Sequence, residues 1–119
     1  MAVYFKTNNP AELLKAFKKK IDDRRVVTWS YDKDGDFTHD VPQWKNLAWL
    51  RPRVRVGELA LFILSPKQRQ VTTEVYAVYH GRFIESMLAH CDSLFTQGVA
   101  SAMAEGEDII SSTLGSFAD

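Results

Sequence analysis

Residues 48–64 read AWLRPRVRVGELALFIL, and this stretch decides the predicted fold. In its first half every second position carries a tryptophan or an arginine, as on one face of a strand. We call these four residues the Trp-Arg row: Trp49, Arg51, Arg53 and Arg55. Gly57-Glu58 supplies a turn, and the run Leu59–Leu64 is apolar on both faces, which is typical of a central strand. The stretch therefore predicts a hairpin that joins a half-exposed strand to a buried one.

The other positions of the half-exposed strand are predicted to face the core, and they are Leu50, Pro52, Val54 and Val56. Because proline has no N–H to give to a neighbouring strand, Pro52 indicates a sheet edge or a bulge. The charged face has two interpretations. It is a solvated sheet face balanced by acids such as Glu74, or it is a binding surface.

Alternation and turn residues predict the remaining strands, and helical spacing predicts two helices. Asn9 is a good N-cap before Pro10, and Asp34-Gly35 suits a tight hairpin turn. The first helix turns a lysine-rich face outward, formed by Lys15, Lys18, Lys19 and Lys20. The predicted strands cover residues 3–6, 26–31, 37–41 and 71–80, and the predicted helices cover residues 10–22 and 81–96.

These elements predict the α+β class. We expect a two-layer domain with a mainly antiparallel sheet of five to six strands and two main helices packed on one face, in the order β-α-β-β-β-β-β-α. The predicted domain covers residues 1–98. Residues 99–119 are small and acidic, and they predict a weakly structured C-terminal extension.

Charge is unevenly distributed along a chain whose formal net charge is zero. Residues 1–70 hold 14 Lys and Arg against 8 Asp and Glu, whereas residues 71–119 hold one, Arg82, against 7. The asymmetry indicates either a basic binding surface or two halves that attract each other. The sequence pI of 6.8 disfavours a dedicated nucleic-acid domain, for which values above about 9 are usual.

The composition predicts a small soluble, cytoplasmic protein of bacterial type that makes no membrane contact. The longest apolar run, residues 59–64, is far shorter than the ~20 residues of a membrane span. The first ten residues lack the apolar core of a signal peptide. The single cysteine, Cys91, excludes an internal disulfide and indicates a reducing compartment.

We predict no cofactor and no metal. The sequence contains no Gly-rich phosphate loop, no G-x-S-x-G elbow and no H-E-x-x-H motif. The segment DKDGD, residues 32–36, resembles the start of a calcium loop. However, the positions that need glycine and glutamate hold Phe37 and Gln43, and a hairpin turn explains the segment.

The leading functional hypothesis is a non-enzymatic protein-binding module that docks through the Trp-Arg row. Tryptophan and arginine dominate interface hot spots. Trp44, in the preceding loop, is predicted to be either an exposed anchor or a plug of the core. Small immunity proteins and antitoxins act by such docking, which is an analogy of class only. A protein partner is expected, and a homo-oligomer stays open.

The alternative hypothesis is an RNA-binding domain or a metal-independent ribonuclease. In it His39 or His80 is the acid or base, and the three arginines of the row clamp phosphate. Nothing in the sequence brings either histidine beside the arginines. A third class, a small-ligand pocket lined by Trp29, Tyr31 and Phe37, competes with a plain core role for these aromatic residues.

Overall fold

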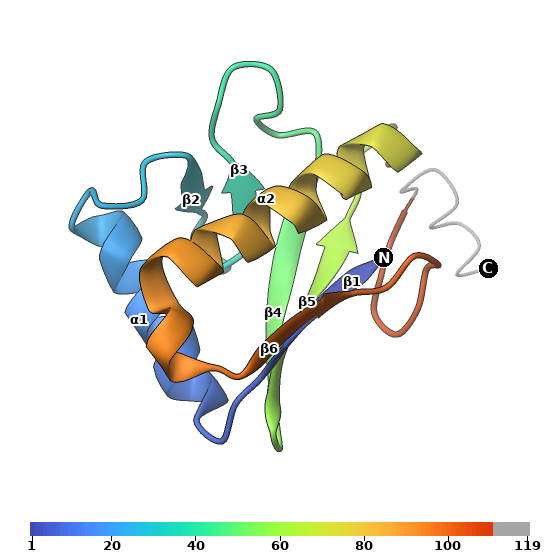
Figure 1. Ribbon diagram of the computed structural model, residues 1–119. Helices are drawn as coiled ribbons and strands as arrows, with labels where there is room; N and C mark the ends of the chain where they lie inside the picture. The colour runs from blue at the N-terminus through green and yellow to red at the C-terminus, as the bar shows by residue number, and fades with distance from the viewer. Residues whose placement is uncertain (111–119) are drawn as a thin grey trace.

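The structure, a computed structural model, describes residues 1–110, and in them an antiparallel six-stranded sheet is combined with two α-helices (Figure 1). The predicted α+β class is therefore confirmed. The strands are β1 (Ala2–Lys6), β2 (Trp29–Tyr31), β3 (Phe37–His39), β4 (Trp49–Arg55), β5 (Glu58–Leu64) and β6 (Gln97–Ala100). The helices are α1 (Pro10–Asp22), α2 (Thr73–Cys91) and the short 3-10 helix η1 (Asp92–Leu94). Within residues 1–110, no helix has both the length and the hydrophobicity needed to cross a membrane.

The strand order is β2-β3-β4-β5-β1-β6, so the first strand lies between the fifth and the last. β4 and β5 form the predicted hairpin, in which Arg55 is opposite Glu58 and Gly57 takes a φ of 83° in the turn. Gly35 takes the same φ in the predicted turn between β2 and β3. Both turns use glycine for the left-handed conformation that other residues rarely adopt.

In the part of the chain that the structure describes, the outer half of β4 is a free edge of the sheet. β4 pairs with β5 along its whole length but with β3 only at Leu50. Pro52 lies on this unpaired part, so its predicted edge position is confirmed. Leu50 is fully buried, whereas Val54 and Val56 are exposed. The prediction that these two valines face the core is wrong, because the hairpin extends beyond the packed core.

The main core lies between the sheet and the helices. The rings of Phe17 in α1 and Phe83 in α2 have centroids 5.1 Å apart, which packs both helices over the same sheet face. In Figure 1, α2 crosses in front of the strands. A smaller cluster of Ala2, Ala60 and Phe62 lies on the opposite face, with Tyr4 packed against it.

Residues 73–80 of the segment Val71–His80 are helical, so the prediction of this segment as a strand is wrong. α2 begins at Thr73 and continues through Gly81, where the sequence predicted a new helix to start. The side chain of Thr72 caps this helix by accepting a hydrogen bond from the backbone N–H of Val75. Buried side chains then recur every four residues along one face of α2: Val75, Tyr79, Phe83 and Met87.

The sixth strand is β6, which crosses the predicted boundary at residue 98. It pairs with β1, from Gln97 opposite Lys6 to Ala100 opposite Val3. Residues 101–110, which we call the C-terminal segment, then return to the end of β5, where Ile109 bridges Leu64. Residues 111–119 of the predicted extension lie outside the described residues.

Candidate functional site

The Trp-Arg row lies on the sheet face opposite the helices. The β4–β5 register places Arg51 opposite Phe62 and Arg53 opposite Ala60, both in the smaller apolar cluster. Residues opposite each other in an antiparallel pair share a face of the sheet. The sheet therefore separates the Trp-Arg row from the main core and from both helices.

Arg51 makes the most buried ion pair of the row. Its Nε and Nη2 donate to the two carboxylate oxygens of Asp36 at 2.9 and 2.7 Å. The Asp36 side chain is only 5% exposed, and its hydrogen bond raises the pKa of Arg51. Asp36 and Arg51 come next in register after Phe37 and Leu50. The ion pair thus continues the β3–β4 pairing where backbone pairing stops.

Arg53 and Arg55 make more exposed pairs. Arg53 Nε donates to Glu107 at 2.7 Å, and Arg55 Nη1 donates to Glu58 at 3.2 Å. The arginine side chains stay 44% and 41% exposed. Acids therefore balance the row as one interpretation predicted. Glu74, the acid named in that prediction, is instead in the first turn of α2, on the other side of the sheet.

The C-terminal segment covers the smaller apolar cluster beside the row. Glu105 accepts a hydrogen bond from the Tyr4 hydroxyl, and burial together with this bond raises the pKa of Tyr4 to about 12. The Asp108 side chain is 1% exposed and accepts the backbone N–H of Ile63 at 2.9 Å. In Figure 1 the segment lies beside the N-terminus, and the Met1 amino group is 3.2 Å from Asp108.

Gly106 lets the C-terminal segment approach the sheet closely. Its φ is 58°, and a Cβ atom on it would lie 2.5 Å from Cε1 of the Phe62 ring. Phe62 is fully buried and has no room to move aside without disturbing the sheet. The C-terminal segment therefore packs tightly against this face of the sheet.

The two tryptophans of the prediction differ in their surroundings. Trp49 is half-buried opposite Leu64. Trp44 packs against the main core, and its carbonyl oxygen accepts a hydrogen bond from the Tyr79 hydroxyl. These contacts favour the core plug over the exposed anchor for Trp44.

His39 is buried on the helix side of the sheet. It stacks on Trp29 with ring centroids 4.6 Å apart, and its Nδ1 lies 2.8 Å from the carbonyl oxygen of Thr28. In the neutral ring Nδ1 therefore carries the proton. Burial lowers the pKa of His39. The ring lines a cavity of about 410 Å³ with Arg82 and Glu85, and not with any arginine of the row.

His80 is buried in α2 with a lowered pKa, again because of burial. Neither ring nitrogen makes a hydrogen bond of ordinary geometry among the described residues, and the nearby Met1 backbone offsets part of this lowering of the pKa. It lines a groove between α2 and β6 rather than the His39 cavity. The ribonuclease hypothesis requires His39 or His80 beside the arginines of the row, and the structure places neither of them there.

The aromatic residues of the third hypothesis are divided between core and surface. Trp29 and Phe37 are fully buried in the main core. Tyr31 is half-buried and lines a surface groove, to which neither Trp29 nor Phe37 contributes.

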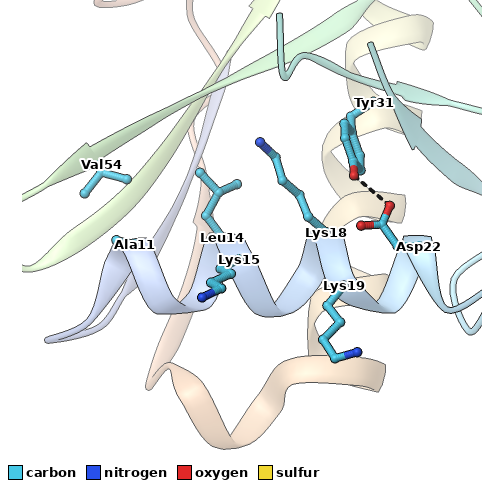
Figure 2. Close-up of a pocket in the computed structure, with 8 residues that line it drawn as sticks. All are labelled: Ala11, Leu14, Lys15, Lys18, Lys19, Asp22, Tyr31 and Val54. Atoms are coloured by element: carbon cyan, nitrogen blue, oxygen red, sulfur yellow. Dashed lines mark hydrogen bonds between the residues drawn. The ribbon is translucent and has the colours of Figure 1, made fainter. Parts of the chain in front are cut away.

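That groove lies between α1 and the free part of β4, has a volume of about 520 Å³, and is shown in Figure 2. Its apolar lining is Ala11, Leu14, Tyr31 and Val54, and its charged lining is Lys15, Lys18, Lys19 and Asp22. The Tyr31 hydroxyl donates to Asp22 at 2.6 Å, and Lys18 Nζ lies 5.2 Å from the centre of the Tyr31 ring. The sequence showed the lysine pattern, but only the fold places Val54 and Tyr31 beside it.

Asp32, Asp34 and Asp36 bring carboxylate oxygens within 4.8 Å of one another. Asp36 is bonded through both oxygens to Arg51, and Asp32 Oδ1 accepts the backbone N–H groups of Asp34 and Asp36. This cluster is thus explained as the hairpin turn that the sequence predicted.

Comparison with known proteins gives no relative: no family model, no curated protein and no solved structure matches this chain.

Proposed function

We propose that this chain is a non-enzymatic protein-binding module that takes an acidic, extended segment of a partner protein into the α1–β4 groove. The observation that carries the proposal is the combination of Lys15 and Lys18 with an apolar floor in one groove. The third lysine of the groove, Lys19, donates to Asp23 at 2.9 Å. An anionic partner segment with one apolar side chain would match both features. The single cysteine supports a reducing location such as the cytoplasm.

The free edge of β4 supports an extended partner. Arg55 and Glu58 flank a two-residue turn and form a hydrogen-bonded pair of the β4–β5 ladder. Hydrogen-bonded and non-hydrogen-bonded pairs alternate along such a ladder, so the N–H and C=O groups of Val54 point away from β5. Val54 also lines the groove. A partner strand would bond to Val54 while its side chains meet the lysines of α1.

The arginines of the row have a secondary role in this proposal. Each already holds a carboxylate of this chain, so none offers an unoccupied guanidinium. Arg53 and Arg55 remain partly exposed on the other face of the same strand, where they would add long-range attraction for an acidic partner. The predicted class of function is kept, and the contact surface moves to the groove.

The test is a binding titration with a labelled synthetic peptide of glutamates around a central leucine. We expect the Lys15→Glu/Lys18→Glu variant to weaken binding at least about tenfold, or 1.4 kcal/mol. Lys67→Glu/Arg69→Glu makes the same charge change in the exposed loop after β5 and should leave binding unchanged.

Two results would overturn the proposal. The first is equal weakening of peptide binding by both double variants, which would show that the net charge of the protein, and not the groove, sets the affinity. The second is binding of single-stranded RNA in place of the peptide, with a steep fall in affinity as salt rises, which would promote the nucleic-acid hypothesis.

A further inference from the structure

The second edge of the sheet, β6, has a free row of backbone groups. Among residues 1–110, β6 pairs with β1 on one side only, and all four of its residues are exposed. The Ser101 N–H donates to the carbonyl of Ala2, so alternate residues of the strand direct their backbone groups toward β1. Gly98 and Ala100 lie between these positions. The N–H and C=O groups of Gly98 and Ala100 therefore point away from β1, outward from the edge of the sheet.

This edge lacks the features that keep edge strands apart. Edge strands usually carry charges or proline that prevent pairing with another chain. Residues 97–104, QGVASAMA, contain no charged residue and no proline. Val99 and Met103 are exposed apolar side chains within this run.

The surface of α2 next to β6 continues the uncharged area. Ala77, Gly81, Ile84 and Leu88 follow one another at helical spacing on the outer side of α2. The helix lies close to the strand, since a Cβ on Gly98 would be 3.6 Å from Ile84. A groove of about 320 Å³ runs between them and is lined by residues of both elements.

We propose that a second copy of this chain covers this edge, with the two β6 strands antiparallel about a twofold axis at Val99. Gly98 then faces Ala100 of the second copy, and the outward groups of both residues pair reciprocally. The two Val99 side chains meet across the axis on the face opposite α2. A twofold interface places each residue near its own counterpart, so an uncharged strip is the composition that avoids like-charge repulsion.

The first test is sedimentation velocity on the full chain from about 1 to 100 μM, the range of weak dimers. We expect a species of twice the 13.6 kDa chain mass. Val99→Lys should raise the dissociation constant at least tenfold, because it places two lysines across the axis. Ala100→Pro should do the same, because it removes an outward N–H but none that β1 uses. Val56→Lys, on the fully exposed β4–β5 turn, should leave the dimer intact.

Hydrogen exchange gives a second, local readout. The amides of Gly98 and Ala100 should be protected in the wild-type chain and exchange rapidly in Val99→Lys, with the amides of β1 protected in both. Wild-type protein that stays monomeric at the highest concentration would overturn the proposal. A dimer that survives both edge variants, or free exchange of Gly98 and Ala100 in the dimer, would also overturn it.

Discussion

The ion pair between Arg51 and Asp36 should stabilise the β3–β4 junction far more than the Arg53–Glu107 and Arg55–Glu58 ion pairs stabilise the β4–β5 hairpin. The two strands share one backbone register pair, Phe37 with Leu50, and the ion pair occupies the next position. The proposed perturbation is Asp36→Asn, which keeps the shape of the side chain. It removes the negative charge and turns one of the two acceptor oxygens into an NH₂ group that faces a guanidinium donor.

The expected cost follows from burial. Hydrogen bonds to charged groups contribute about 1.5–3 kcal/mol, and solvent at the 36% exposed Arg51 reduces this, so we expect a loss of about 1.5–2 kcal/mol. Glu107→Gln breaks the Arg53 pair, in which both side chains are nearly half exposed, and should cost only about 0–1 kcal/mol.

The assay is urea unfolding of both variants, followed by hydrogen exchange of the β2–β3 hairpin. Asp36→Asn should accelerate exchange in Phe37–His39, whereas Glu107→Gln should not. Equal losses in the two variants would refute the reasoning, since burial would then not set the strength of the pairs. A loss below about 0.5 kcal/mol for Asp36→Asn would refute it as well.

Two further predictions concern the cover of the second sheet face and the buried histidines. Gly106→Ala should destabilise the fold by about 1–3 kcal/mol more than Gly57→Ala. Both glycines have a positive φ, but only at Gly106 would the added Cβ collide with the Phe62 ring. Equal urea midpoints for the two variants would contradict this prediction. Burial holds the pKa values of His39 and His80 below their ordinary 6.5, so their protonation is linked to unfolding. Stability should be complete above pH 6.5 and fall by up to about 1.4 kcal/mol per pH unit for each histidine as the pH drops through the folded pKa values. His80→Gln should flatten this dependence below pH 6.5, and an unchanged slope would show that His80 does not cause it.

Local patterns predicted the parts of the fold that depend on near neighbours. The β4–β5 hairpin, the turn at Gly35 and the start of α1 all have their signals within a few residues. Asn9 occupies the predicted cap position of α1, although its side chain makes no capping hydrogen bond.

The prediction for residues 71–80 failed because two periodicities coincide there. The Val, Thr and Tyr residues alternate as in a strand, yet Val75 and Tyr79 also start the four-residue spacing that continues through Phe83. The cap at Thr72 and the continuity of this spacing across Gly81 were signals that favoured one long helix.

The site depended on contacts that no local pattern encodes. Glu107 reaches Arg53 from 54 residues away, and Asp36 reaches Arg51 from another hairpin. β6 is rich in small residues and forms only because β1 offers an edge. The α1–β4 groove likewise needs Val54 and Tyr31 from separate strands. Only the arginine alternation and the lysine-rich face of the first helix were readable in advance.

The position of β1 inside the sheet sets the order in which the chain completes its fold. β1 pairs with β5 and β6, which follow it by more than 50 and 90 residues respectively. β2 to β5, by contrast, are joined to their neighbours by short connections and pair with the strand just made. During synthesis the meander can form first, while β1 keeps one side unpaired until residue 100 has been added. The sheet can therefore close around β1, the first strand to be made, only after β6 has been made.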